Sequence, residues 1–152
     1  MIPFFVELLV RFHELHMDIE KALEQLPEEA MDWSPGPEMN SISVLITHLT
    51  GAERFWVGDV IKSDSSNRDR DAEFQVHGLG KNSLLQRWQE TEAYLTSTFA
   101  TLQLSDLDAT RIHPKRGYEV SVASSLLHAL EHAAIHQGHI QMTAQLWQQK
   151  QT

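Results

Sequence analysis

The sequence predicts an all-α protein, a four-helix bundle with one long crossover between its second and third helices. Four stretches in which apolar residues recur at intervals of three and four predict the helices, and the polar, aperiodic residues 62–80 predict the crossover. Strand-like alternation is confined to a few residues around 118–120. We expect residues 1–152 to form a single domain, because a chain of 152 residues that is 41% hydrophobic can build one core.

The first helix is predicted over residues 3–26. Its apolar positions fall on one face, namely Phe5, Leu8, Leu9, Phe12, Leu15, Ile19, Leu23 and Leu26. Pro27 then ends the helix, because the residue before a proline disfavours the helical conformation. A loop follows at residues 27–40, which contain three of the five prolines.

The second helix begins near Asn40, Ser41 or Ser43, since short polar side chains accept hydrogen bonds from the first free N–H groups of a helix. Its apolar face comprises Ile42, Leu45, Leu49, Ala52 and Trp56. We expect it to end near Ile61. Residues 62–80 are polar and contain glycine, so they predict a long solvated crossover with room for one short helical turn.

The third and fourth helices complete the bundle. The buried face of the third is predicted at Leu84, Trp88, Leu95, Phe99 and Leu102. Residues 104–120 connect it to the last helix, with Pro114 and Gly117 as helix breakers. The fourth helix has its apolar face at Val122, Leu126, Leu130, Ala133, Ile140, Ala144 and Trp147.

The composition of the sequence argues against several classes of function. The formal net charge of -9 argues against a nucleic-acid or anionic-membrane surface, which needs clustered lysine and arginine. No cysteine is present, so disulfides, thiolate ligands and a cysteine nucleophile are excluded. The apolar residues 2–10 lack a basic region before them and a cleavage site after them, and no run is long enough to span a membrane. We therefore expect a cytoplasmic protein that acts on a small molecule.

The segment LHALEHAAIHQGHI, residues 127–140, contains four histidines of the predicted fourth helix. At about 100° per residue, His136 lies roughly 80° from the centre of the apolar stripe and His132 roughly 120°. His139 and His128 lie farther away, at about 140° and 160°. Only His132 and His136 therefore border the core. Because these two histidines are an i, i+4 pair, they can bind one metal ion together. The four histidines cannot all converge on one ion, because residues 128–139 span about 16 Å along the helix.

A third metal ligand must come from another helix, since a catalytic zinc-type site usually has three protein ligands and an open position. His48 is the best candidate, because it lies in the middle of the second helix beside the apolar face. Histidines three or four residues apart also arise by chance in a histidine-rich helix. The pair alone therefore leaves open the alternative of boundary or surface histidines.

Two segments together resemble the DinB-like superfamily of metalloenzymes, which includes thiol-dependent S-transferases. They are LEQLPEEAMDWSPGPEMNSISVLITHLTGAERFW and, far downstream, LLHALEHAAIHQGHIQM. The resemblance covers most of the chain and implies a four-helix bundle with an unusual crossover, often a homodimer. It also implies that His48, His132 and His136 bind a divalent metal ion. His139 stands where many members have glutamine, as in a subgroup with H-x-G-H, so the resemblance leaves the substrate open.

Three neutral imidazoles leave a zinc, nickel or iron ion with its full charge, which indicates an enzyme. The metal would activate water, as in a hydrolase, or a low-molecular-weight thiol cosubstrate, as in the S-transferases that the resemblance suggests. A general base is not assigned. Ala133 stands where the zinc-peptidase motif H-E-x-x-H has its glutamate. We expect Glu53 to be solvated or a partner of the capping loop, and Glu131 to be a surface charge.

Three alternative functions compete with this interpretation. A di-iron carboxylate bundle needs E-x-x-H pairs, and no glutamate of this sequence has a histidine three residues later. A non-catalytic metal-binding, stress-related interaction module stays open, because a sequence does not reveal an open coordination position. A bundle that binds an apolar ligand or partner without metal also stays open.

Overall fold

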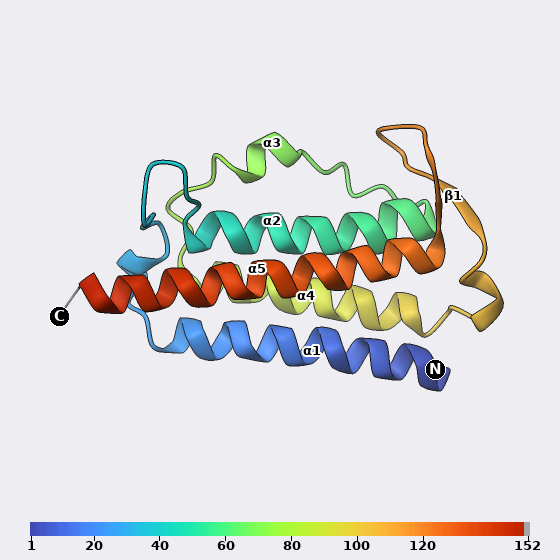
Figure 1. Cartoon of the computed structure of the whole chain (residues 1–152), viewed down its shortest axis with the longest axis horizontal. Helices are drawn as coiled ribbons and strands as arrows, with labels where there is room; N and C mark the ends of the chain where they lie inside the picture. The colour runs from blue at the N-terminus through green and yellow to red at the C-terminus, as the bar shows by residue number, and fades with distance from the viewer. Residues whose placement is uncertain (151–152) are drawn as a thin grey trace.

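Four long helices lie alongside one another in the computed structural model, which describes residues 1–150 (Figure 1). They are α1 (Pro3–Glu24), α2 (Ile42–Arg54), α4 (Lys81–Phe99) and α5 (Val122–Lys150). The predicted all-α four-helix bundle is therefore confirmed. No helix within the described residues is long and apolar enough to cross a membrane.

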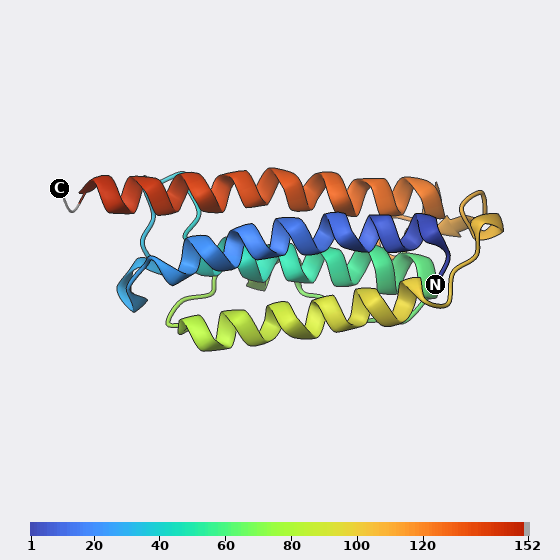
Figure 2. The same cartoon turned by 90° about the horizontal axis from the view of Figure 1, so that it is seen from below.

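The order and direction of the helices explain the long crossover. Helix α1 runs in the same direction as α5, and α2 runs in the same direction as α4 (Figures 1 and 2). Both α4 and α5 pack against α1 and α2. Because α2 and α4 are parallel, the chain must return along the bundle between them, and the predicted crossover does so.

Helix α2 begins as predicted and ends in an unusual way. The Ser41 side chain caps it by accepting a hydrogen bond of 3.3 Å from the backbone N–H of Val44. After Arg54 the chain continues as a π-helix, η2 (Phe55–Lys62), whose wider turn changes the direction of the following side chains. In η2, Asp59 accepts hydrogen bonds from the backbone N–H and the hydroxyl of Ser66, both 3.0 Å. These bonds fix the start of the crossover to α2.

The crossover contains the short helix α3 (Arg70–Glu73), which Figure 1 shows beside α2. Asp69 caps α3 by accepting hydrogen bonds of 3.1 Å from the backbone N–H groups of Asp71 and Ala72. Helix α3 is in contact with α2. A short helical turn in the crossover was predicted from the sequence, but its contact with α2 was not.

A β-hairpin and two short 3₁₀ turns complete the fold. The turns are η1 (Glu28–Ala30) and η3 (Leu104–Asp106), and the hairpin comprises β1 (Thr110–Ile112) and β2 (Glu119–Ser121). Arg111 lies opposite Val120 in the antiparallel pair. Gly117, with a φ of 72°, supplies the left-handed conformation in the connecting turn. The sequence indicated extended residues only near β2, because strands of three residues are too short to show an alternating pattern.

The apolar core lies between the four helices, as predicted. Aromatic rings meet at its centre, where the ring centroid of Phe99 is 6.2 Å from that of Phe5 and 6.0 Å from that of Phe12. Trp88 and Leu49 are also buried there. This core holds the helices at fixed distances, which the side chains described below require.

One polar pair is enclosed in the core. His16 of α1 lies with its Nε2 3.2 Å from Oε1 of Glu53 in α2, and the two side chains are 1% and 0% exposed. The expectation of a solvated Glu53 is therefore wrong. Glu53 does point away from His48, as its position on the helix requires, but the side that it faces is the bundle interior rather than solvent.

We predict that the stabilisation from this pair declines as pH rises. Burial by itself lowers the pKa of His16, but the carboxylates of Glu53 and Glu92 outweigh burial and raise it above the usual value. A raised pKa in the folded state means that the contribution is complete below the unfolded pKa of about 6.5 and is lost as pH rises through the folded pKa. Urea unfolding of wild type and His16→Gln measures the difference.

The difference in the free energy of unfolding between wild type and His16→Gln should be larger at about pH 5.5 than at about pH 9. The control is His77→Gln, since His77 is exposed in the loop before α4. This control substitution should change the free energy of unfolding only slightly at both pH values. A difference for His16→Gln that grows with pH would contradict the interaction.

Candidate metal centre

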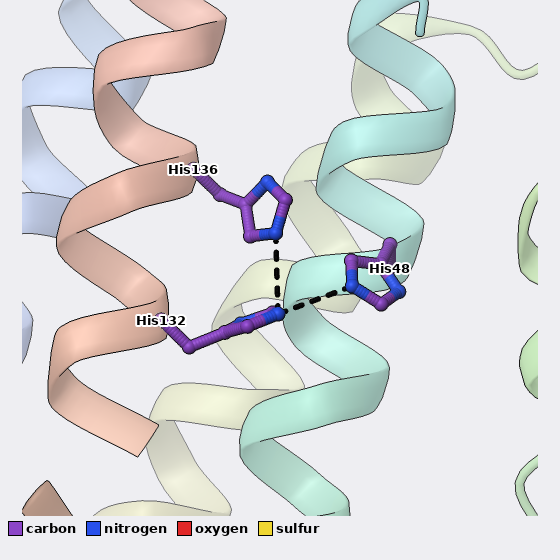
Figure 3. Close-up of side chains that lie close together, drawn as sticks. All are labelled: His48, His132 and His136. Atoms are coloured by element: carbon purple, nitrogen blue, oxygen red, sulfur yellow. Dashed lines mark hydrogen bonds between the residues drawn. The ribbon is translucent and has the colours of Figure 1, made fainter. Parts of the chain in front are cut away.

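Three histidines from α2 and α5 converge where these two helices are in contact (Figure 3). The Nε2 atom of His132 lies 3.1 Å from Nε2 of His48 and 3.1 Å from Nε2 of His136. One ring nitrogen from each of the three lies within 4.8 Å of the others. The structure therefore brings together all three residues that were predicted as ligands.

The local sequence explains this convergence. Ala129 and Ala133 face the interior from α5, and His132 and His136 lie at the edge of that apolar face. They stand one turn apart, so their rings leave the helix on the same side. His48 lies in the middle of α2 and is only 6% exposed, because α3 and α5 cover it.

The spacing of the nitrogens fits a divalent metal ion. In a tetrahedral site with metal–nitrogen distances of about 2.0–2.1 Å, neighbouring ligand nitrogens lie about 3.3–3.4 Å apart. The two shortest separations here, both 3.1 Å, are close to that value. When two unprotonated ring nitrogens approach each other this closely, their lone pairs repel. A proton or a metal cation between the two nitrogens removes this repulsion.

The electrostatics of α5 also fit metal binding. Burial, together with the positive charges that neighbouring histidines would carry, lowers the pKa of His132 to about 3. Burial and the charges of His48 and His139 lower the pKa of His136 to about 4. Both rings are therefore neutral at pH 7, which is the form in which imidazole binds a metal.

Glu73 of α3 orients His48. Its Oε2 lies 2.9 Å from Nδ1 of His48, which donates the hydrogen bond and so directs the unprotonated Nε2 towards His132. Metal-binding histidines commonly have such a carboxylate behind them. Burial alone would raise the pKa of Glu73, but hydrogen bonds from Arg68 and His48 outweigh burial and lower it, so the carboxylate is ionised at pH 7.

Arg68 completes this arrangement from the crossover. Its Nε and one terminal nitrogen contact the two Glu73 oxygens at 2.5 and 2.8 Å, a bidentate ion pair. Sequence reasoning missed both residues, since they lie in a segment that was predicted to be solvated. The available signal was weak: Asp69 is a suitable helix cap, and the apolar Phe74 follows in an otherwise polar stretch.

The remaining histidines lie outside this group. His139 has its Nδ1 3.4 Å from Nδ1 of His136, and it is exposed. The His128 ring packs against Trp56 at a tilt of 60°, with 4.4 Å between ring centroids. His113 is buried in the hairpin turn, 5.3 Å from Trp56 by the same measure.

A cavity of about 700 Å³ lies beside the three histidines, with His48 and His132 in its lining. Helix α2, η2, the crossover, the hairpin and the start of α5 all contribute to it. Trp56, expected to be a packing residue, lines this cavity, and so does His128. The three-histidine group is therefore accessible to a small molecule.

Comparison with known proteins extends these observations. A family model described as "Protein of unknown function (DUF1572)" matches residues 2–152. No curated protein matches the sequence. Among solved structures, a conserved protein from Enterococcus faecalis is 15% identical with a TM-score of 0.80, and the match covers 96% of this chain and 98% of that chain.

Two proteins from Bacillus subtilis are also similar in structure. The DinB-like protein YjoA is 16% identical with a TM-score of 0.70, over 91% of this chain and 90% of that chain. YfiT, described as a probable metal-dependent hydrolase with an unusual four-helix bundle topology, is 15% identical with a TM-score of 0.72, over 95% and 89% of the two chains.

At such low identities the structural likenesses establish the fold alone, which is the DinB-like bundle that the sequence motifs indicated. The family match covers nearly the whole chain, including both helices that supply the three histidines. The chain therefore belongs to the family described as proteins of unknown function (DUF1572), which is one of the DinB-like families.

Proposed function

We propose that this protein is a metal-dependent enzyme that holds a divalent ion with His48, His132 and His136 and activates water or a low-molecular-weight thiol. The main support is the convergence of three imidazole nitrogens beside a cavity large enough for a small substrate. The description of the similarly folded YfiT as a probable metal-dependent hydrolase favours the hydrolase form. Zinc, nickel and iron all accept such ligands.

The number of ligands favours catalysis over a structural role. Among residues 1–150, no fourth histidine or carboxylate joins the group. Structural zinc sites have four protein ligands, whereas catalytic sites have three and keep one position open. A divalent ion supplies Lewis acidity there, which lowers the pKa of a water or thiol and polarises a carbonyl.

The side chains of this protein have distinct roles in the proposal. Glu73 fixes the proton of His48 on Nδ1, and Arg68 holds Glu73 in place and balances its charge. Glu53 is enclosed on the opposite side of α2, so it does not act as the base. A thiol would have to arrive with a cosubstrate, because the chain has no cysteine.

The formation of a homodimer and the cytoplasmic location of the protein stay predictions.

Gly51 provides space for the Glu73 carboxylate. A Cβ atom at position 51 would overlap Oε1 of Glu73 and lie 3.3 Å from Nε of Arg68. Glu73 is held between Arg68 and His48 and is 7% exposed, so it cannot move aside without losing these contacts. Gly51 is thus a positioning residue for His48.

We predict that His48→Ala, His132→Ala and His136→Ala each lower metal affinity by more than the 10–100-fold that is typical of outer-shell partners. Elemental analysis and competition with a chromophoric chelator measure this loss. His128→Ala and His139→Ala are matched controls on α5, and they should retain the metal. Full occupancy in any of the first three variants would remove that histidine from the site.

Gly51→Ala and Glu73→Gln should each weaken metal binding by about 10–100-fold, since both weaken the orientation of His48. Gly138→Ala in α5 is the control, because a Cβ there meets nothing within 4 Å. It should leave metal affinity unchanged and stabilise the helix by about 0.5–1 kcal/mol. Unchanged affinity in both Gly51→Ala and Glu73→Gln would show that Glu73 does not orient the ligand.

Activity assays distinguish the two chemistries. We expect the metal-loaded protein either to hydrolyse members of a panel of esters and amides, or to join a small thiol to an electrophile. The activity should disappear in His132→Ala and persist in His139→Ala. If the loaded protein is inactive in both panels, the non-catalytic metal-binding module becomes the better interpretation.

A further inference from the structure

The cavity beside the three histidines is basic, although the protein as a whole is acidic. Its lining includes Arg68, Arg70, Lys115 and Arg116, with Glu119 as its one acidic residue. The whole chain has 21 acidic and 12 basic residues, so a third of its basic side chains surround this one cavity. Clefts lined by one sign of charge concentrate the field and attract ligands of the opposite sign.

Three of these cations are available to a ligand. Arg68 is occupied by Glu73, but within the part of the chain that the structure describes no carboxylate lies within ion-pair distance of Arg70, Lys115 or Arg116. All three are exposed to the solvent that fills the cavity. Their charges are therefore not neutralised from within the protein.

The cations are also held in place by two separate segments. Arg70 begins α3, with its guanidinium 5.0 Å from the ring of Phe74. Lys115 and Arg116 occupy the hairpin turn, which is closed by a hydrogen bond of 2.9 Å from the backbone N–H of His113 to the carbonyl oxygen of Tyr118. Lys115 Nζ also donates to the carbonyl oxygen of Arg68, a bond of 2.5 Å that joins the hairpin to the crossover. The backbone that carries these cations is thus fixed, and the side chains of Arg70 and Lys115 have contacts of their own.

The rest of the lining suits the uncharged part of an organic molecule. Phe55, Trp56 and Tyr118 contribute aromatic surface, and His48 and His132 stand at the metal-binding side. The volume of about 700 Å³ is within the range of small-molecule sites, roughly 300–1,000 Å³. A ligand with an anionic group and an apolar body matches both parts.

We propose that the substrate of this site is a small organic anion, a carboxylate or a phosphate ester, whose charged group is bound by Arg70 and Arg116. Its apolar body contacts Trp56, and its reactive bond is directed towards His48 and His132. Arginine suits this role because its planar guanidinium binds carboxylate and phosphate with two hydrogen bonds. The inference rests on the proposed function and specifies the class of substrate.

The test measures binding, so that it does not depend on activity. Calorimetric titrations compare phenylacetate and phenyl phosphate with neutral phenylacetamide, using both zinc-loaded and metal-free protein in a buffer without phosphate or carboxylate. We expect at least one of the two anions to bind about tenfold or more tightly than the amide. Tighter binding of phenylacetate identifies a carboxylate ligand, and tighter binding of phenyl phosphate identifies a phosphate ester.

Variants identify the groups that bind the anion. Arg70→Gln and Arg116→Gln should each weaken anion binding by about tenfold and leave both amide binding and zinc content unchanged. Arg11→Gln, at an exposed arginine on α1 that pairs with Glu14, should have no effect on any of these. Equal affinity for anion and amide, or undiminished anion binding in both cavity variants, would overturn the proposal.

The two proposals fail in different ways. Anion binding that depends on Arg70 and Arg116 in a protein that takes up no zinc would support the anion site and refute the metal centre. Zinc uptake together with equal binding of anion and amide would refute the anion site alone. Loss of anion preference on removal of zinc, with no effect of either arginine variant, would assign the preference to the metal and overturn the present inference.

Discussion

The parallel orientation of α2 and α4 is the constraint on which the candidate site depends. Parallel neighbours cannot be joined by a short turn, so residues 63–80 must return along the bundle, and they do so over α2. The return path brings Glu73 to His48 and Arg68 to Glu73. A bundle with short connections throughout would leave His48 without the cover of α3 and without the carboxylate partner of its Nδ1. The topology therefore supplies the partners that orient one of the three rings.

Helix α2 separates two buried polar groups of different kinds. His48 faces α5 and the crossover, where its partners leave Nε2 free for a ligand. Glu53 faces the interior on the other side, where its Oε1 contacts Nε2 of His16. A carboxylate that itself bound the metal would reduce the charge of the ion, so this separation would keep the proposed ligand set neutral. The pair with His16 also gives the apolar core a polar contact whose geometry few other packings would reproduce.

Sequence reasoning succeeded where periodicity determines the contact. The four helices follow from apolar spacing, and the angular positions of His132 and His136 on α5 follow from helix geometry alone. Residues in the crossover and the hairpin have no such period, so neither Glu73 nor the basic residues at the cavity could be assigned to a place. Glu53 was misjudged for a related reason. Five residues after His48 on the same helix, it points about 140° away from that side chain. A single helix does not reveal which of its faces a neighbouring helix will cover.

Charge balance connects the proposed metal centre with the basic cavity. Three neutral imidazoles do not offset the charge of a divalent ion, and the Glu73 carboxylate is already balanced by Arg68. Arg70 and Arg116 add further positive charge on the same side of α2. Uncompensated charge in a partly buried site is costly, and water compensates it less well when an apolar body displaces the solvent. An anionic ligand would supply the missing negative charge together with that apolar body, so the proposed metal and the arginines would favour the same class of molecule.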